Sequence, residues 1–500
     1  MFSTLLGIDA GTSSVKVIVA DPSRGVLGTA SRAYRNEAPH PGWSEQDPEE
    51  WWSATVAAAA EALEQARKQG NVVVRGIAVT GQMHSFVLVD RQYRPLRRAI
   101  TWLDTRARDL VPEIQSVLDA KGLSRGIANR VASGLTLPPL VWLRRNEPEI
   151  LNRAAALLMV KDYLRLRLTG TIGADPTDGS ATLLMDVGRR QWIPELEALF
   201  GVSQEILPPL SDPWEVAGTV RADLHQQFGG RSTGGAPMGE DIVVAVGSGD
   251  QQAAALANGV LRPGVIQMMV GTGGQIATPL DHLPEEPPVT LNHFCHHRNW
   301  LAQGSIQNGG AALTWVQNLL GAEWRDYETA MHSADLMEAP LFVPYLTGER
   351  TPLMDAGATG SWMRLRQTTS RDDLLYAAVE GVVFGFTDAL DEVRRQAGGG
   401  QGFEIRVGGG GTRSTRYIRL LCDVVGEPLT VMPHGNTTAL GAAILGGVAA
   451  GTFSDLDQGV AALGVGTATV IQPDMERHHL LSQRRDLFHR LRRDSLTTGE

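Results

Sequence analysis

The chain has 500 residues, of which 43% are hydrophobic and 20% are charged, and its formal net charge is −10. This length exceeds what one core can fill and predicts two or three domains, and the hydrophobic content excludes a disordered chain. The negative charge argues against a nucleic-acid surface, although backbone N–H groups and a few cations can still hold an anionic small molecule.

Three features of the sequence bear on the cellular compartment. The two cysteines, Cys295 and Cys422, provide no disulfide framework and fit a reducing compartment. The N-terminal sequence "MFSTLLGIDAG" lacks the basic start and the long apolar core of a signal peptide. The longest apolar run, residues 439–453, is short for a membrane span and rich in Gly and Ala, so it predicts a buried helix. We therefore expect a cytoplasmic protein that does not enter a membrane.

The first predicted element is a β-hairpin over residues 7–21, "GIDAGTSSVKVIVAD". Two apolar runs flank a turn of small and hydroxyl residues, and a carboxylate, Asp9, directly follows the first run. Gly and Ser at a tight turn between β-branched runs need no function. An ordinary hairpin and a ligand-binding turn therefore both fit this stretch taken alone.

Two predicted helices carry N-terminal capping signals. In the first, Asp47 can cap the helix, Pro48 suits the first helical position, Glu50 completes a capping box and Gly70 can end the helix. In the second, a capping box at residues 370–373 opens a segment whose apolar positions recur at helical spacing until an "AGGG" stop.

Strand-like runs occur between these helical segments. Each run is apolar and ends in glycine and hydroxyl residues, which is typical of buried strands in α/β proteins. The runs cover residues 75–81, 241–249, 265–273 and 403–411.

The pattern of apolar strand, Gly-Thr turn and apolar strand occurs twice, at residues 7–21 and at residues 269–279. Two related halves, each with a hairpin of glycine and hydroxyl residues, predict a cleft in which the two turns face one ligand from opposite sides. We place the boundary near residue 245, which gives an N-terminal domain of residues 1–245 and a C-terminal domain of residues 246–500.

The turns lack the standard nucleotide-binding fingerprints. The sequence contains no Walker-type G-x-x-x-x-G-K-[ST] loop, and no G-x-G-x-x-G opens a helix as a Rossmann fold requires. Successive small residues can still form an anion-binding nest, and the hydroxyls of Thr12, Ser13, Ser14 and Thr272 add donors. Two such hairpins suit a nucleoside triphosphate, and Asp9 beside one of them is a suitable anchor for hydrated Mg²⁺.

A third glycine run, "VGGGGTRS" at residues 407–414, follows a strand and precedes an amphipathic helix. Four glycines are often a flexible connection, but such a junction also lets a flat ring approach the backbone closely, which suits adenine or ribose. Because this is the third glycine turn in one chain, we interpret it as a ligand site.

Asp250 lies where an apolar strand ends and an Ala-rich helix begins. Most Asp residues at such a junction are only N-caps. A second carboxylate at the mouth of the same cleft also suits a general base that accepts a hydroxyl proton during phosphoryl transfer. Gln251 beside it can hydrogen-bond a polyhydroxylated substrate.

Eight stretches of the chain together resemble the FGGY carbohydrate kinases, and among these the xylulokinases. The stretches are "GIDAGTSSVKVIVAD", "PHPGWSEQDPEEWW", "GQMHSFVLVD", "KDYLRLRLTG", "GSGDQQAAALANGV", "FVPYLTGERTP", "VGGGGTRSTRYIRLLCDVVGEPL" and "ALGAAILGG". The resemblance implies an α/β, two-domain actin-like ATPase fold of the ribonuclease-H type, with ATP and sugar in the interdomain cleft. It also implies Mg²⁺ and transfer of the γ-phosphoryl group to a terminal sugar hydroxyl, which among xylulokinases belongs to D-xylulose.

The resemblance further implies roles for individual residues. Asp9 is similar to the metal-associated acid of the family, and Asp250 is similar to its catalytic base. The residues similar to those that bind the sugar are Met83, His84, Trp102, Asp250 and Gln251. Those similar to residues that bind ATP are Thr12, Ser13, Gly271, Thr272 and Gly309 for the phosphates and Gly409, Gly410, Gly411 and Ser414 for the adenosine.

Three positions depart from the family pattern. Leu103 stands where xylulokinases commonly carry Asn, Pro139 where the first family signature has Lys, and Arg364 where the second signature has Gly. Leu103 lies near the expected sugar site and removes a polar group, so it bears on the identity of the sugar more than on the chemistry. Another ketose or a polyol is therefore an alternative substrate, and a nucleotide-binding or sugar-sensing protein without kinase activity is an alternative of another class.

Some segments carry less information. "NHFCHH", residues 292–297, fits no standard zinc spacing. The basic segment of residues 477–495 predicts a solvated amphipathic helix rather than a membrane or nucleic-acid arm. The frequent dimers of the family are the only ground for expecting a homodimer.

Overall fold

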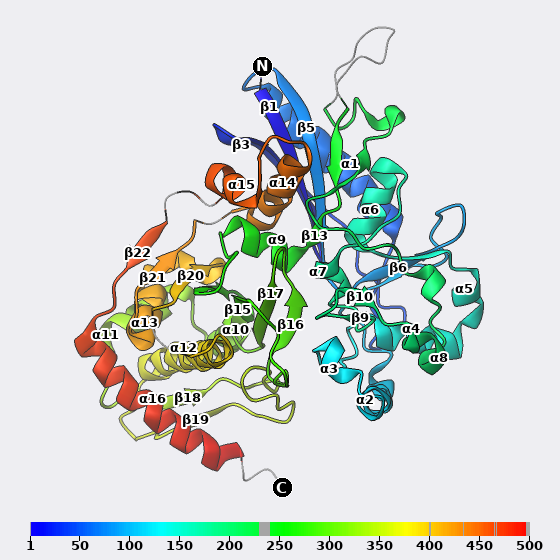
Figure 1. Ribbon diagram of the computed structural model, residues 1–500. Coiled ribbons are helices and arrows are strands. Elements are labelled where there is room, and N and C mark those ends of the chain that lie inside the picture. The colour runs from blue at the N-terminus through cyan, green and yellow to red at the C-terminus, as the bar shows by residue number, and fades with distance from the viewer. Residues whose placement is uncertain are drawn as a thin grey trace. The chain divides into compact units, whose positions relative to one another are not determined.

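The structure is a computed structural model of the chain, and it describes residues 2–229, 241–399, 402–433, 435–464, 466 and 468–496. The chain forms two compact units, whose elements are labelled in Figure 1. The first unit comprises Met1–Leu261, His293–Trp300 and Gly435–Val465, and the second comprises Arg262–Asn292, Leu301–His434 and Gly466–Glu500. These units differ from the expected ranges 1–245 and 246–500, because helices α9 (Asp250–Ala257) and α14 (Thr437–Ala449) pack beside the sheet of the first unit.

A seven-stranded sheet forms the centre of the first unit. Its strand order is β11-β12-β5-β1-β2-β3, with β13 also paired to β5. Strand β1 runs parallel to β5 and antiparallel to β2, and β5 runs parallel to β12 and β13. The strands are β1 (Phe2–Ala10), β2 (Ser14–Asp21), β3 (Gly25–Ala33), β5 (Val72–Gly81), β11 (Val216–Thr219), β12 (Val243–Ala245) and β13 (Ser248–Gly249).

Helices cover both faces of this sheet. Leu6 and Ile8 of β1 belong to the core that includes α1 (Pro48–Arg67), whereas Leu5 belongs to the core that includes α14. Successive side chains of a strand point to opposite faces, so β1 is buried on both sides. This explains why its sequence is a continuous apolar run rather than an alternating one.

The rest of the first unit has a core of its own around a four-stranded sheet of order β4-β7-β6-β8. The strands are β4 (Glu45–Gln46), β6 (Phe86–Val89), β7 (Ala99–Ile100) and β8 (Ala156–Met159), with β9 (Met185–Asp186) and β10 (Gln191–Trp192) as a separate pair. The remaining helices of the first unit are α2 (Val111–Ala120), α3 (Ser124–Ile127), α4 (Leu137–Asn146), α5 (Pro148–Arg153), α6 (Val160–Thr169), α7 (Pro176–Gly179), α8 (Glu195–Phe200) and α15 (Leu456–Leu463). Of these, α6 and α15 contribute side chains to the cores on the two faces of the central sheet. The 3₁₀ helices are Arg108–Leu110, Gln204–Ile206 and Ala222–Leu224.

The second unit contains most of another seven-stranded sheet, of order β16-β17-β15-β14-β20-β21-β22, and a pair formed by β18 and β19. The edge strand β16 belongs to the first unit from His293 onward. The strands are β14 (Val265–Val270), β15 (Gly274–Leu280), β16 (Asn292–Cys295), β17 (Trp300–Ile306), β18 (Leu341–Val343), β19 (Ser361–Met363), β20 (Glu404–Gly408), β21 (Leu429–Val431) and β22 (Thr469–Ile471). The helices are α10 (Gly310–Leu320), α11 (Trp324–Ser333), α12 (Arg371–Gln396), the 3₁₀ helix η4 (Gly410–Arg413), α13 (Thr415–Val425) and α16 (Met475–Leu496).

Both predicted hairpins are confirmed. In the first, β1 and β2 are antiparallel, with Asp9 opposite Lys16 and Ala10 opposite Val15. In the second, β14 and β15 are antiparallel. Each hairpin therefore places its glycine and hydroxyl residues at the turn, as the sequence pattern predicts.

The first predicted helix begins as expected but lacks the predicted capping box. The side chain of Asp47 accepts a hydrogen bond from the backbone N–H two residues later and caps α1. The carboxylate of Glu50 accepts instead from the backbone N–H of Arg35, so it does not close a capping box. The helix ends at Arg67, slightly before Gly70. In the second predicted helix, α12, the capping box of residues 370–373 is present.

Helix α14 is the buried helix predicted from the long apolar run, and it touches its neighbours through backbone. A Cβ atom on Gly7 of β1 would lie 1.9 Å from the carbonyl oxygen of Ala439, and one on Gly441 would lie 1.9 Å from that of Ala253 in α9. Only glycine permits these approaches. Within the described part of the chain, no helix has the length and apolar character that a membrane span requires.

Replacing Gly441 by Ala is expected to lower the free energy of unfolding by about 1–3 kcal/mol, because the added methyl group forces α14 away from α9. Gly385 of α12 is the matched control, since a Cβ atom there meets nothing within 4 Å. Ala at that position is expected to stabilise its helix by up to about 1 kcal/mol. Chemical denaturation of both variants measures the difference, and equal stabilities would contradict the close approach.

Candidate active site

The two predicted acids lie at the same edge of the first sheet. Asp9 in β1 pairs with Thr80 of β5, and Ser248 of β13 pairs with Thr80 from the other side. Because neighbouring strands are about 4.8 Å apart, the backbones at Asp9 and Ser248 are separated by about 10 Å. Asp250 follows as the first residue of α9, with Gly249 as the N-cap. Both carboxylates thus lie at carboxyl ends of parallel strands, where α/β sheets bind their ligands.

Burial raises the pKa values of both Asp9 and Asp250. Burial raises the pKa of Asp9 to about 6, although Lys16 opposes this shift. Burial and the negative charge of Asp9 raise the pKa of Asp250 to about 7, against hydrogen bonds from Gln251. A carboxylate with a pKa near neutrality is suited to accept a proton from a reacting hydroxyl.

The backbone of the first turn is held by groups outside the hairpin. The hydroxyl of Tyr34 donates to the carbonyl of Gly11, and the backbone N–H of Tyr34 donates to the carbonyl of Ser13 at 3.2 Å. The amide of Gln46 donates to the carbonyl of Thr12 at 2.7 Å. The side chain of Thr12 is partly exposed and that of Ser13 is exposed. The turn therefore fixes its carbonyls inside the protein and leaves hydroxyl groups at the surface.

Hydrogen bonds connect the first turn to two other predicted site segments. The indole N–H of Trp102 donates to the hydroxyl of Thr12 at 3.0 Å, and the backbone N–H of Trp102 donates to the hydroxyl of Ser85 at 3.0 Å. The amide of Gln82 donates to the side-chain oxygen of Gln46 at 2.8 Å, and Gln46 in turn holds the turn. The structure thus brings Trp102 and the "GQMHS" segment together with Thr12.

The "GQMHS" segment lies directly beside the start of α9. A Cβ atom on Gly249 would lie 3.1 Å from Cγ of Met83, so Met83 contacts the residue that precedes Asp250. His84 has a left-handed backbone with φ of 68°, and the hydroxyl of Thr136 donates to its carbonyl at 3.1 Å. Its Nδ1 lies 2.7 Å from the carbonyl oxygen of Ala181, and because a carbonyl only accepts, Nδ1 carries the proton. The orientation of the His84 ring is therefore fixed.

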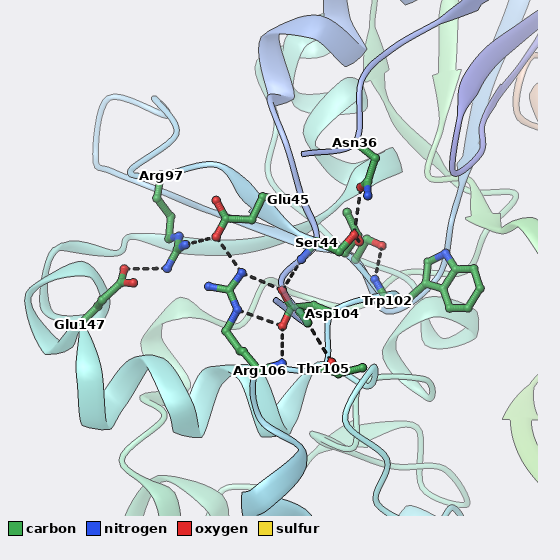
Figure 2. A network of polar contacts seen from close by, with 12 residues as sticks. Asn36, Ser44, Glu45, Arg97, Trp102, Asp104, Thr105, Arg106 and Glu147 are labelled. Atoms are coloured by element: carbon green, nitrogen blue, oxygen red, sulfur yellow. Dashed lines mark hydrogen bonds and ion pairs between the residues drawn. The ribbon is translucent and has the colours of Figure 1, made fainter. Parts of the chain in front are cut away.

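A buried polar network supports the loop that carries the predicted sugar-site tryptophan, as Figure 2 shows. The guanidinium of Arg106 contacts the carboxylates of Asp104 and Glu45, each at 2.7 Å. Arg97 also contacts Glu45, and it reaches Glu147 at 2.6 Å. Two arginines thus share three acids, which fixes this loop more firmly than isolated surface pairs do.

The second turn is brought together with the start of α10 in the second unit. The backbone N–H of Gly310 donates to the carbonyl of Gly271 at 2.8 Å, and that of Ala311 donates to the carbonyl of Thr272 at 2.8 Å. A Cβ atom on Gly309 would lie 3.0 Å from the carbonyl oxygen of Gly271. The three predicted phosphate residues of this unit, Gly271, Thr272 and Gly309, therefore lie in one place.

The third glycine run adjoins the strand that leads into the second turn. A Cβ atom on Gly409, which has φ of 90°, would lie 2.5 Å from the carbonyl oxygen of Val270. One on Gly411 would lie 2.5 Å from the Val270 side chain, whereas one on Gly410 would meet nothing within 4 Å. The run therefore needs glycine for packing at two positions and leaves an open surface at the third.

Ser414, the fourth predicted adenosine residue, already has two partners. Its hydroxyl accepts from the backbone N–H of Tyr417 at 3.1 Å and thereby caps α13. The same hydroxyl donates to the carboxylate of Glu328. The hydroxyl of Ser414 therefore has a structural role beside the glycine run.

The predicted site residues divide between the two units. Those of the first unit are Asp9, Thr12, Ser13, Met83, His84, Trp102, Asp250 and Gln251. Those of the second unit are Gly271, Thr272, Gly309, Gly409, Gly410, Gly411 and Ser414. Within each unit, the contacts above join predicted residues that are far apart in the sequence.

The three departures from the family pattern lie in different surroundings. Leu103 is 44% exposed and follows Trp102 in the loop, and Pro139 is buried in the first turn of α4. Arg364 adopts a left-handed φ of 62°. Glycine reaches this conformation without strain, so the structure explains why the family signature has Gly there.

Sequence reasoning missed three residues that support the site: Lys16, Tyr34 and Gln46. Lys16 could have been predicted from the sequence, because the register of a hairpin with a short turn places it opposite Asp9. Tyr34 and Gln46 meet the turn through long-range packing, and no local pattern in the sequence signals such contacts.

The "NHFCHH" segment is held by ordinary hydrogen bonds. Nε2 of His296 lies 2.8 Å from the carbonyl oxygen of Val260. The thiol of Cys295 lies 3.5 Å from the carbonyl oxygen of Val187. Within the described ranges, no group of three or more His, Cys, Asp or Glu side chains is placed to hold a metal ion.

Comparison with known proteins identifies the family. Residues 4–257 match the N-terminal domain of the FGGY family of carbohydrate kinases, and residues 268–450 match the C-terminal domain of the same family. The chain belongs to this family. It is 31% identical to a xylulose kinase of Escherichia coli, covering 97% of this chain and 98% of that protein, and 31% identical to one of Staphylococcus epidermidis, covering 96% and 94%. It is also similar to the crystal structure of a xyloylose kinase from Brucella ovis, with 32% identity, 98% coverage of both chains and a TM-score of 0.88.

Family membership settles the general activity and the fold class. The chain is an ATP-dependent sugar kinase with the two-domain, actin-like α/β fold predicted from the sequence. Its small-molecule partners are accordingly a sugar and ATP.

Proposed function

We propose that this sugar kinase phosphorylates D-xylulose to D-xylulose 5-phosphate. The observation that carries the proposal is the contact between Met83 and Gly249, which joins the Met83-His84 pair to Asp250. The relatives named xylulose kinase, each at about 30% identity over nearly the whole chain, support the same sugar.

Asp250 acts as the general base in this proposal. Its carboxylate accepts the proton of the terminal sugar hydroxyl while the hydroxyl oxygen bonds to the γ-phosphorus of ATP. The bond between that phosphorus and the bridging oxygen breaks, and ADP leaves. The raised pKa of Asp250 supports this role. A pKa near the working pH leaves part of the carboxylate ionised and still gives it enough affinity for the proton that the hydroxyl releases.

The sugar is oriented by the side chains around Asp250. His84 has a fixed ring, Gln251 has an amide that can hydrogen-bond the sugar, and the indole of Trp102, whose N–H is held by Thr12, offers a partly exposed ring face. Leu103, next to Trp102, presents an apolar side chain where xylulokinases commonly have an amide. Such positioning contributes a large part of the rate in phosphoryl transfer, since the transition state needs little covalent help from the protein.

Asp9 is suited to anchor Mg²⁺ together with nucleotide phosphates. Its carboxylate is buried, and its negative charge raises the pKa of Asp250, so a bound cation would stabilise the ionised form of both acids. Mg²⁺ commonly binds through one or two carboxylates plus water and phosphate oxygens, so one protein acid is a sufficient donor set. When bound, the ion neutralises the charge that develops on the phosphates.

The nucleotide is held by the turns in this proposal. Thr12 and Ser13 in the first unit, and Gly271, Thr272 and Gly309 in the second, bind phosphate oxygens through N–H and hydroxyl groups. Gly409, Gly410 and Gly411 receive the adenosine, and the open surface above Gly410 supports this role. Ser414 contributes by capping the helix behind them.

Turnover of a panel of ketoses and polyols with Mg-ATP tests the sugar assignment, with ADP and phosphorylated sugar both measured. We expect D-xylulose to give the largest kcat/KM. A larger value for another ketose or a polyol would replace the sugar and keep the kinase chemistry. ADP formation without any phosphorylated sugar would favour a nucleotide-binding or sugar-sensing protein.

A further inference from the structure

One face of α6 carries buried charged groups that the proposed mechanism does not use. Nζ of Lys161 lies 2.6 Å from the carboxylate of Asp162, 2.8 Å from that of Asp175 and 3.6 Å from that of Asp178. Arg165 contacts Asp162 at 3.1 Å. All five side chains are at most 1% exposed.

Arg165 extends from this cluster to the segment that precedes Asp250. Its Nη1 donates to the carbonyl of Val246 at 2.8 Å, and its Nη2 donates to the carbonyl of Gly173. One residue further on, Gly247 has φ of 87°, and a Cβ atom there would lie 2.1 Å from the carbonyl oxygen of Val79. The backbone is therefore fixed at the beginning of the short segment 246–249.

Thr177 fixes the end of the same segment. The carboxylate of Asp175 accepts hydrogen bonds from the backbone N–H of Thr177 at 2.7 Å and from its hydroxyl. The hydroxyl oxygen of Thr177 in turn accepts from the backbone N–H of Gly249 at 2.9 Å. Because that hydroxyl donates to Asp175, its lone pairs point toward Gly249, the N-cap of the helix that begins with Asp250.

Stability alone does not account for such a cluster. Removing several charges from water costs more than their mutual attraction commonly returns, and well-packed apolar side chains often replace a buried ion pair without loss. Burial also raises the pKa of Asp178, which shows how unfavourable this site is for a further negative charge. What apolar side chains cannot reproduce is a hydrogen bond of fixed direction to a backbone N–H.

We propose that Thr177 is a positioning residue for phosphoryl transfer: held by Asp175 and Lys161, it fixes the backbone of Gly249 and thereby the direction in which Asp250 meets the sugar hydroxyl. The inference rests on the proposed function, because it concerns the proposed base. It adds Thr177 and the buried charged residues that hold it to those that determine the rate of phosphoryl transfer.

Thr177→Val tests the proposal, since Val keeps the shape of Thr and removes only the hydroxyl. We expect kcat for sugar phosphorylation to fall about 10- to 100-fold, as a shift of a reacting group by less than 1 Å can cause, while the KM for ATP stays within about twofold. Thr177→Ser restores the hydroxyl and should recover most of the activity. Thr55→Val is the matched control, because Thr55 is also buried in the first unit and its hydroxyl donates to the carbonyl of Trp51 at 2.7 Å.

The control separates positioning from loss of stability. Thr55→Val and Thr177→Val should both lower the melting temperature, but only Thr177→Val should lower kcat. Equal kcat values for wild type and Thr177→Val would overturn the proposal, and so would failure of Thr177→Ser to recover activity. If the wild type phosphorylates no sugar, the proposed function fails independently of the variants.

Hydrogen exchange of the wild type gives a readout that needs no activity and no folded variant. The amide of Gly249 should exchange as slowly as the amides of the central strand β5, because its N–H is bonded to a buried hydroxyl. Exchange as fast as in exposed loops would overturn the proposal even for an inactive protein. Slow exchange together with the kcat loss of Thr177→Val would establish it.

Discussion

Replacing Asp250 by Asn is expected to lower kcat for sugar phosphorylation by about 10²- to 10⁴-fold, the range that a positioned proton acceptor contributes. Asn has the shape of Asp and can keep a hydrogen bond to Gln251, but it does not take up the hydroxyl proton. The KM for ATP should change little, because the residues proposed to bind ATP are the glycines and hydroxyls of the turns. Steady-state kinetics with direct measurement of phosphorylated sugar gives both constants.

Asp109→Asn is the control for this substitution, since the Asp109 side chain is 90% exposed and pairs only with the exposed Arg108 in the described structure. It removes the same charge without touching the sheet edge, so it should leave both constants unchanged. If Asp250→Asn phosphorylated the sugar at the wild-type rate, the proton would have to go elsewhere, and the assignment of the base would be wrong.

The same carboxylate predicts the pH dependence of the wild type. A general base works only in its ionised form, so activity should be lost as the pH falls through the pKa of Asp250, which is about 7 in the protein alone. A bound cation favours the ionised form and would move this loss to lower pH. The residual activity of Asp250→Asn should lack this acidic limb, which a pH profile of kcat/KM for the sugar would reveal.

The parts of the site that the sequence predicted are those encoded locally. Both hairpins were predictable because two apolar runs and a turn of small residues determine a hairpin within about 15 residues. Asp9 and Asp250 could be singled out because each lies where an apolar strand ends, and residues at the carboxyl ends of parallel strands gather at one edge of a sheet.

The parts that the sequence did not predict depend on contacts over long distances in the chain. Thr177 and Gly249 are 72 residues apart, and nothing in "ADPTDGS" indicates that its Thr accepts a backbone hydrogen bond from another segment. The two units of the structure differ from the boundary expected near residue 245 for the same reason. Helix α14 comes late in the sequence, but Gly7 and Gly441 let its backbone dock against the first sheet and α9. Glycine at a helix interior gives little sign of which partner approaches it.

The basic C-terminal segment was predicted to be a solvated amphipathic helix, and the structure shows how its polar side is used. Leu481 and Phe488 of α16 are fully buried, which confirms the amphipathic pattern. Arg484 is also buried, and its guanidinium donates to both carboxylate oxygens of Glu380 in α12, at 2.6 and 2.7 Å. Part of the basic character therefore serves packing within the second unit, on whose outer side α16 lies in Figure 1.

Replacing Arg484 by Met is expected to lower the free energy of unfolding by about 3–5 kcal/mol, because it leaves the carboxylate of Glu380 buried without its partner. The loss should exceed that of Arg325→Met, since Arg325 pairs with Glu323 at the exposed surface. Adding Glu380→Gln to Arg484→Met should recover much of the loss, because Gln removes the unpaired charge and still accepts the hydrogen bond that the Tyr376 hydroxyl donates to Glu380. Urea denaturation of the single and double variants measures these differences in the free energy of unfolding. A double variant no more stable than Arg484→Met would show that lost packing, rather than the unpaired charge, causes the loss of stability.

The pH dependence of Arg484→Met distinguishes these explanations further. Burial raises the pKa of Glu380 even beside Arg484, whose hydrogen bonds lower it. Without the arginine, the pKa in the folded state rises further above that in the unfolded state, so the folded protein binds the proton more tightly. The free energy of unfolding of Arg484→Met, relative to the wild type, should therefore recover as the pH falls through this raised pKa. Lost packing alone would leave the difference the same at every pH, because no proton is taken up.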